Sequence, residues 1–271
     1  MILQQKQAGW AILWMAALAA SFSAPVFQIA FAVLAIGVIG MAHGASDLAI
    51  VRQGRQLFFL MSYGLAIVLC LIWWHTSPAV ALPGFLLASA IHFGLEDAPD
   101  GGLAERIARG VSLIATPATL HQDEFRAILH GAGLAPTLPD TVTCSLALLG
   151  GVAAVGLLTV GFFSRNKRLI TGTLALLILP PFVGFSLGFL ILHALPQTEQ
   201  RRDQLGYVRY TDYLRAIWPV LLGAIAIAGM AAFMLFPKGP DGFRSLFAAL
   251  ASLAIPHLLI TTWFASRNRT V

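Results

Sequence analysis

The sequence predicts an all-α protein, a polytopic bundle of about 8–10 transmembrane segments that includes short or broken helices. Of its 271 residues, 58% are hydrophobic and 11% are charged, whereas soluble domains carry about 25% charged residues. The apolar residues form blocks of roughly 17–25, the length that a helix needs to cross a bilayer. No polar stretch is long enough to fold separately. We therefore expect a single integral-membrane domain over residues 1–271.

The apolar blocks give the expected elements in chain order. They cover residues 9–23, 26–49, 56–75, 79–97, 107–120, 140–163, 168–180, 182–197, 212–236 and 243–265. The first block predicts an N-terminal helix within residues 1–25, and the fifth is short enough to be re-entrant. Pro180 and Pro181 separate the seventh block from the eighth, because two prolines remove backbone donors and clash with the preceding turn. This segment is either one broken span or a tight hairpin of two short spans.

Basic residues in the short loops predict the orientation. They gather after alternate blocks: Arg52 and Arg55; Arg106 and Arg109; Arg165, Lys167 and Arg168; Arg201, Arg202 and Arg209; Arg267 and Arg269. If the segment at Pro180 is a hairpin, almost all these clusters lie on one side, which the positive-inside rule makes cytoplasmic. The exceptions are Arg126, Lys238 and Arg244. We favour the hairpin, in a multi-pass protein of the inner (plasma) membrane. The excess of 17 basic over 12 acidic residues needs no nucleic-acid partner.

Four of the seven histidines lie at or near the ends of apolar blocks: His43, His92, His193 and His257. Ionisable side chains inside a bilayer are costly and usually functional. In the topology above, all four fall at a similar depth in the cytoplasmic half, which independent core histidines would have no reason to do. The pattern predicts a metal site. Imidazole suits iron, zinc, copper and nickel, and haem with two axial histidines stays open as an alternative.

Two of these histidines precede an aspartate: Asp47 follows His43 by four residues, and Asp97 follows His92 by five. A metal-bound imidazole usually donates its second ring N–H to a carboxylate or carbonyl. Each aspartate is therefore predicted to orient its neighbouring histidine. The alternative is a capping or interface aspartate beside an ordinary buried histidine. The remaining histidines are predicted at an outer interface or in a solvated loop: His75, His121 and His130.

In chain order, the motifs are HGxxD at His43–Asp47, HFGxxD at His92–Asp97, His193 after a long apolar run, and Pro256-His257. This combination resembles the Brp/Blh family of membrane β-carotene 15,15′-dioxygenases over about residues 28–264. The resemblance implies a multi-span helical fold with non-haem Fe2+. It also implies cleavage of the central double bond of β-carotene by O2 to give retinal, the chromophore of rhodopsins, and hence a link to a rhodopsin. His43, His92 and His193 match proposed iron-binding positions.

One position departs from the family pattern. Members typically carry a second histidine four residues after the third motif, where this chain has Gln197. The fourth ligand is thus contested between His257 and the position of Gln197, and the exact carotenoid and cleavage position stay open. The expected partners are a carotenoid, O2 and the lipid bilayer. The alternatives are a non-catalytic protein that binds carotenoid, retinal or haem, and a transporter, whose ionisable groups usually occupy several depths.

Overall fold

The computed structural model describes residues 2–133, 140–235 and 242–261, and every regular element in these ranges is helical. The all-α prediction is confirmed. Seven helical stretches of the described residues are long and apolar enough to cross a membrane: Pro25–Ile50, Gln53–Thr76, Pro78–Asp97, Asp140–Phe163, Pro181–Gln204, Tyr210–Ala231 and Phe243–Ile260. A shorter apolar helix covers Gly9–Ser21. The predicted block end at 262–265, together with Lys238, Arg267 and Arg269, lies outside the described residues.

The α-helices are α1 (Ile2–Ser21), α2 (Pro25–Leu34), α3 (Met41–Gly44), α4 (Asp47–Ile50), α5 (Gln56–Thr76), α6 (Pro78–Asp97), α7 (Leu103–Ala115), α8 (Pro117–Leu120), α9 (Gln122–Gly131), α10 (Asp140–Phe163), α11 (Lys167–Ile178), α12 (Pro181–Phe189), α13 (Leu195–Gln204), α14 (Tyr210–Leu235) and α15 (Gly242–Pro256). The described residues also form π-helical turns at η1 (Ala35–Gly40), at η3 (Leu190–Ala194) and, after α15, at η4 (His257–Thr261). A single 3-10 turn, η2, covers Gln53–Arg55.

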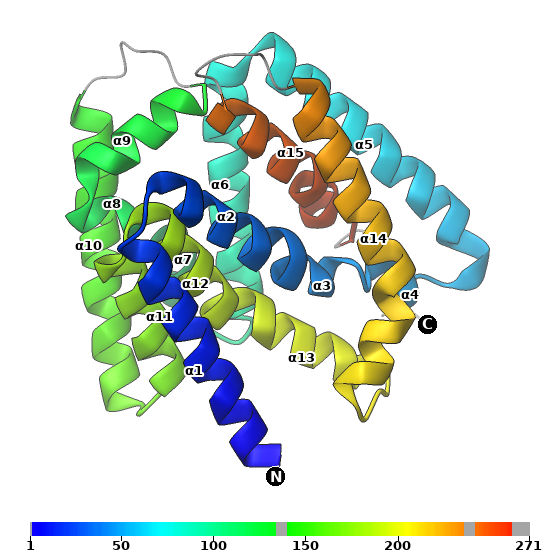
Figure 1. Ribbon diagram of the computed structural model, residues 1–271, viewed down its shortest axis with the longest axis horizontal. Coiled ribbons are helices and arrows are strands. Elements are labelled where there is room, and N and C mark those ends of the chain that lie inside the picture. Colours follow the sequence, from blue (N-terminus) through cyan, green and yellow to red (C-terminus); the bar gives the residue numbers. More distant parts are fainter. Residues whose placement is uncertain (1, 134–139, 236–241, 262–271) are drawn as a thin grey trace.

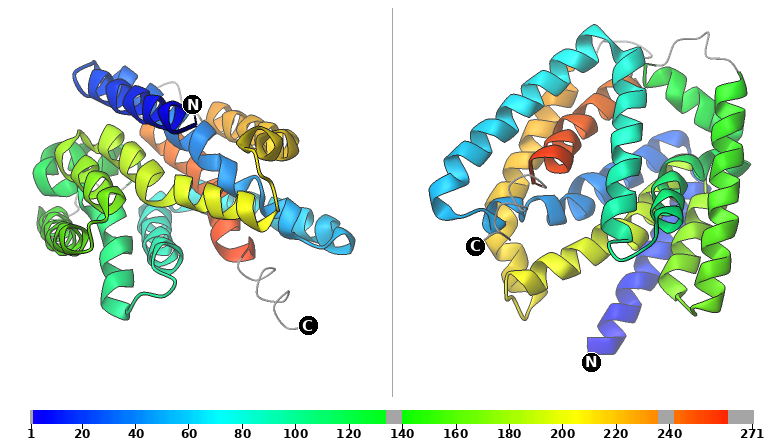
Figure 2. Two further views of the ribbon diagram at one scale, coloured as in Figure 1. Left: turned by 90° about the horizontal axis from the view of Figure 1, so that it is seen from below. Right: turned by 180° about the vertical axis from the view of Figure 1, so that it is seen from behind.

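The helices form two groups (Figure 1). Helices α7–α12 gather on one side, and α5, α14 and α15 on the other. Seen from behind, α6 stands between the groups (Figure 2), and it packs against α7 of one and α15 of the other. The connected segments α2–α3 and α12–α13 run from the first group toward the second. Residues from both halves of the chain therefore meet near the end of α6.

Close backbone packing holds α6 and α7 together. A Cβ atom on Gly110 of α7 would overlap the carbonyl oxygen of Ala90, and one on Gly94 of α6 would overlap the carbonyl oxygen of Arg106. Lipid tails are as apolar as leucine, so membrane helices associate through such close contacts rather than through exclusion of water. These two glycines fix the position of the last turn of α6.

The segment at Pro180 is a hairpin, as predicted. Helix α11 ends at Ile178, α12 begins at Pro181, and the two pack against each other. A Cβ on Gly188 would lie 2.5 Å from the Leu176 side chain, so the small residues of α12 face α11. At the far end of the hairpin, Arg168 lies 3.7 Å from Glu199 of α13. The basic residues that begin α11 and those of α13 thus lie at the same end.

Candidate metal centre

Four imidazole rings, those of His43, His92, His193 and His257, meet in one buried site that we call the four-histidine cluster. The ring centroid of His43 lies 5.1 Å from that of His193 and 5.1 Å from that of His257. Those of His92 are 5.4 Å from His193 and 5.3 Å from His257. The four rings therefore form a closed circuit, and each residue is at most 8% exposed. The cluster therefore brings together His43 and His257, which are 214 positions apart in sequence.

Three of the four histidines are placed by π-helical turns. His43 lies in the short helix α3 that follows η1, His193 lies within η3, and His257 opens η4. A π-helical turn adds a residue to the helical repeat and redirects the side chains beyond it, and such turns are frequent at functional sites. His92 is the exception, because it lies in the last two turns of the regular helix α6.

Hydrogen bonds hold the short helix α3 in place around His43. The hydroxyl of Tyr213, a fully buried residue of α14, donates to the carbonyl of Ala42 at 3.0 Å. The Ser46 hydroxyl donates to the carbonyl of His43 at 2.6 Å. On the other side, Gly40 leaves room for Phe189, since a Cβ there would lie 2.7 Å from the phenyl ring.

The Nδ1 atoms of three imidazoles have hydrogen-bond partners. Nδ1 of His43 lies 2.5 Å from the carbonyl oxygen of Gly40, Nδ1 of His193 lies 2.8 Å from Asp97, and Nδ1 of His257 lies 2.6 Å from Asp47. Because these oxygens accept, each Nδ1 carries the proton, and the lone pair of each ring is on Nε2.

The remaining nitrogens fit a metal ion. Within the described part of the chain, Nε2 of His92 and Nε2 of His257 are buried and have no hydrogen-bond partner. Buried polar atoms are normally satisfied, and an unsatisfied one costs about 1–3 kcal/mol. A transition-metal ion would satisfy them, and held Nδ1 protons with free Nε2 lone pairs are the usual arrangement around such an ion.

The aspartates of the two motifs pair across the structure, contrary to the predicted local pairing. Asp47 holds His257 rather than His43, and Asp97 holds His193 rather than His92. The spacing of four or five residues indicated a shared helix face, but it could not show which ring from another helix reaches that face. Nδ1 of His43 is instead bound to the carbonyl oxygen of Gly40, one turn earlier in the chain.

Gln197 is buried, but its amide faces the backbone. Its Nε2 donates to the carbonyl oxygen of Glu96 at 3.2 Å, which ties α13 to the last turn of α6. Nearby, Arg201 of α13 lies 3.9 Å from Oδ1 of Asp47. Helix α13 thus contacts the motifs of both α4 and α6, and Gln197 joins it to α6 through the backbone of Glu96.

Glu96 is a candidate site residue that the sequence analysis missed. Its Oε2 lies 3.4 Å from Nε2 of His92, and ligand atoms of His92, Glu96 and His193 all lie within 4.8 Å of one another. The signal was present in the sequence, because His92 and Glu96 are four residues apart and so share a helix face.

Aromatic rings cover one side of the cluster. The Phe93 ring centroid lies 4.8 Å and that of Phe189 5.4 Å from the His193 ring. Phe185 stacks on Phe189 at 5.9 Å. Phe93 and Phe189 are less than 9% exposed and belong to the main apolar core. This wall keeps one side of the site apolar and dry.

One other prediction for a histidine was wrong, that for His130, whereas His121 lies between α8 and α9, outside a helix, as expected. Residues 122–131 form the helix α9 instead of a solvated loop, and its Phe125 and Leu129 are buried. His130 lies on this helix, partly buried, and Nε2 of His121 lies 3.0 Å from the carbonyl of Ile178. The pairing of Phe125 with Leu129 at helical spacing was the signal for this helix. His75 is exposed at the end of α5, as expected for an interface.

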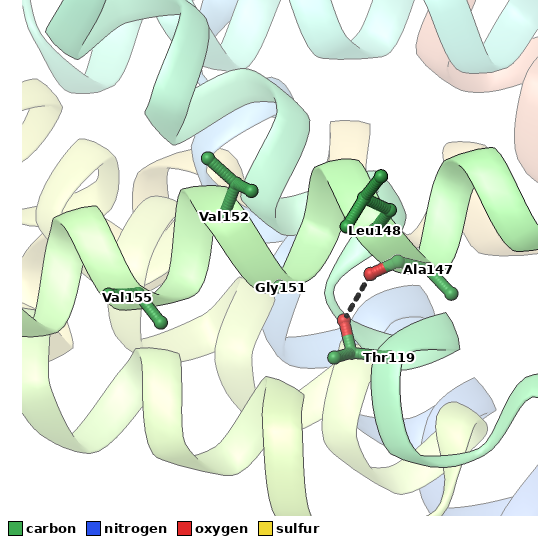
Figure 3. Close-up of a pocket in the computed structure, with 6 residues that line it drawn as sticks. All are labelled: Thr119, Ala147, Leu148, Gly151, Val152 and Val155. Carbon is green, nitrogen blue, oxygen red and sulfur yellow. Dashed lines mark hydrogen bonds between the residues drawn. The ribbon is translucent and has the colours of Figure 1, made fainter.

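A separate apolar groove of about 560 Å³ lies on α10, away from these residues. It is lined by Thr119, Ala147, Leu148, Gly151, Val152 and Val155 (Figure 3). The Thr119 hydroxyl donates to the carbonyl of Ala147 at 3.1 Å, and Leu148 is 70% exposed. The groove contains none of the four histidines, and its exposed aliphatic side chains are those of a lipid-facing helix.

Comparison with known proteins gave one finding. The family model described as Beta-carotene 15,15'-dioxygenase matches residues 34–265, which include all four histidines. Searches of curated proteins and of solved structures gave no match.

Proposed function

Because the chain belongs to the β-carotene 15,15′-dioxygenase family, we propose that it is a non-haem iron enzyme. It cleaves the central double bond of β-carotene, or of a closely related carotenoid, with O2. Both oxygen atoms enter the product, so that one C40 carotenoid yields two molecules of retinal. The four-histidine cluster holds the Fe2+, and Asp47 and Asp97 orient two of its imidazoles. The predicted link to a rhodopsin follows from the product.

One observation supports this proposal above the others. Four buried imidazoles pack edge to face, three of them have Nδ1 bound to an oxygen, and Nε2 of His92 and of His257 has no hydrogen-bond partner among the described residues. A protein that used these histidines only for packing would bury unsatisfied nitrogens at a cost of about 1–3 kcal/mol each. The metal-binding arrangement removes this cost.

The chemistry would divide between the ion and the protein. Ferrous iron, when bound, would supply the electrons that activate O2. Imidazole is a ligand that suits iron, and an ion held by four histidines would keep positions open for O2. Asp47 and Asp97 fix two rings, and Phe93 and Phe189 exclude water and contact the hydrocarbon. A carotenoid dissolved in the bilayer would reach the site laterally between helices.

The cluster is compact, which favours a single ion over haem. Neighbouring imidazole centroids are only 5.1–5.4 Å apart on all four sides. No neighbouring pair is far enough apart for a macrocycle to lie between the rings. A transport path is also disfavoured, because the histidines gather at one place and do not spread across the bilayer.

We assign the site to the cytoplasmic half of the inner membrane. Arg201 belongs to a predicted cytoplasmic basic cluster and lies 3.9 Å from Asp47, which holds His257. The cluster and this basic residue therefore lie at a similar level. The positive-inside rule then supports the cytoplasmic side.

The test is a colour assay in cells that accumulate β-carotene. Expression of the protein should bleach the orange colour and yield retinal, and the purified protein should contain about one iron. His92→Ala should lose both the iron and the bleaching, whereas His75→Ala, at an exposed position, should retain both. Unchanged pigment with well-expressed protein would contradict the enzyme proposal. A Soret band would favour the haem alternative.

A further inference from the structure

The carboxylate of Glu96 lies beside the four-histidine cluster and is not accounted for by the histidine site. Its Oε2 is buried and has no hydrogen-bond partner among the described residues, and the same is true of Nε2 of His92, 3.4 Å away. Arg106 and Arg109 of the neighbouring helix bind elsewhere, to Ala98 and Pro99 carbonyls and to Glu105. A buried carboxylate oxygen without a donor is costly, so its position needs a cation.

The distance between the two atoms has a simple explanation. Two ligand atoms that each lie about 2.1 Å from one ion are roughly 3–3.4 Å apart. The separation of 3.4 Å between Oε2 of Glu96 and Nε2 of His92 falls in this range, and it is long for a charge-assisted hydrogen bond, which is about 2.7–2.9 Å. Ligand atoms of His193 lie within 4.8 Å of both.

The backbone of Glu96 is held on the far side. Gln197 donates to its carbonyl oxygen, and the next residue, Asp97, accepts from His193. Two consecutive residues at the end of α6 are thus tied to η3 and α13. These ties fix the last turn of α6, so that His92 and Glu96 point at one place.

We infer that Glu96 is a ligand of the metal ion and supplies the one carboxylate of a site otherwise made of imidazoles. This inference rests on the proposed iron site. A carboxylate is a hard oxygen ligand that suits Fe2+, and its charge lowers the cost of burying a divalent cation. It also explains how this chain manages without a histidine at position 197. Gln197 positions Glu96, and Glu96 provides the additional donor.

The test compares metal binding by the full-length protein and its Glu96→Gln variant, with Co2+ as a spectroscopic probe and Fe2+ titrated separately. Glutamine keeps the size and hydrogen-bonding capacity of the side chain but is a poor ligand. We expect a dissociation constant at least tenfold higher and a changed visible Co2+ spectrum. The matched control is Glu105→Gln on α7, whose carboxylate pairs with Arg109, and it should bind Co2+ as the wild type does.

The outcomes separate the two proposals. If the wild type binds neither metal, the proposed iron site is wrong, and the role of Glu96 with it. If wild type and Glu96→Gln bind Co2+ with equal affinity and the same spectrum, the iron site stands and the inference about Glu96 is overturned. A second measurement needs no variant. Infrared difference spectra of wild type labelled with 13C-glutamate should show a shifted carboxylate band on addition of Co2+, and an unshifted band would also overturn the inference.

Discussion

At the scale of single residues, each motif aspartate connects two distant parts of the chain. Asp97 ends α6 and holds His193 in η3, and Asp47 begins α4 and holds His257 in η4. Each carboxylate fixes the tautomer and the direction of a ring that belongs to another element. The cluster is therefore preorganised by contacts that cross between helices, and the loss of one carboxylate should loosen one ring.

Asp97→Asn tests this role. The asparagine carbonyl can still accept from Nδ1 of His193, but the negative charge that strengthens the imidazole as a ligand is lost. We expect the Fe2+ dissociation constant to rise by about 10–100-fold, measured by titration of the purified protein. Asp100→Asn, three residues away and exposed, is the control and should have no effect. Equal affinities in the two variants would mean that Asp97 does not support a ligand.

The residue types of the site could be predicted from sequence, but their partners could not. The four histidines could be identified because imidazoles in membrane-length apolar blocks are costly to bury unless they have a function. Their similar predicted depth in the membrane indicated one site. Pairing depends on which side chains from distant helices face each other, and helical spacing contains no such information. For this reason Asp47 and Asp97 were assigned to the wrong rings, whereas the spacing of His92 and Glu96 on one helix did contain a signal.

At the scale of elements, the glycines between α6 and α7 determine where His92 lies. The Ala90 carbonyl occupies the place where a Cβ on Gly110 would be. The contact is with backbone, which cannot rotate away as a side chain can. Any larger residue at position 110 must therefore push α6 from α7 and shift the turn that carries His92 and Glu96.

Gly110→Ala should destabilise the protein. Overpacking of this kind costs about 1–3 kcal/mol, and the displaced α6 should also weaken iron binding. Gly156→Ala on α10 is the matched control, since nothing lies within 4 Å of the added Cβ there, and the gain in helix propensity should make it neutral or stabilising. Thermal unfolding in detergent measures both. Similar unfolding temperatures for the two variants would show that α6 and α7 can separate without cost.

Sequence patterns predict regular elements better than irregular ones. Apolar blocks located the membrane helices, and Pro180-Pro181 located the hairpin. Both signals are local, because the length of an apolar block and the missing backbone N–H groups of proline can be read from the residues themselves. The π-helical turns before His43 and at His193 and His257 had no local signal. A π-helical turn is maintained by the tertiary contacts around it. A prediction based on a repeat of 3.6 residues per turn treats the whole segment as regular α-helix, so it cannot locate such a turn.

At the scale of the whole molecule, the hairpin of α11 and α12 determines the topology. The α10–α11 and α13–α14 connections lie at the lower edge of the molecule, and the α5–α6 connection lies at the upper edge (Figure 1). The ion pair between Arg168 and Glu199 brings the ends of α11 and α13 together. Helix α11 has only 12 residues, about 18 Å, which is shorter than the roughly 30 Å hydrocarbon core. We therefore expect it to be a short arm that returns the chain to the same side of the membrane.

Cysteine labelling of intact cells tests this arrangement. In a background of Cys70→Ala and Cys144→Ala, we place single cysteines by Ser164→Cys, Asp203→Cys and Thr76→Cys, all at exposed positions. Ser164 precedes one basic cluster and Asp203 follows another at the same edge, so a membrane-impermeant maleimide should label both only after permeabilisation. Thr76→Cys lies at the opposite edge and should be labelled in intact cells. If Asp203→Cys were labelled from outside while Ser164→Cys was protected, the chain would cross the bilayer once between them. The four-histidine cluster, which Asp47 and Arg201 tie to this end of α13, would then lie toward the outer side.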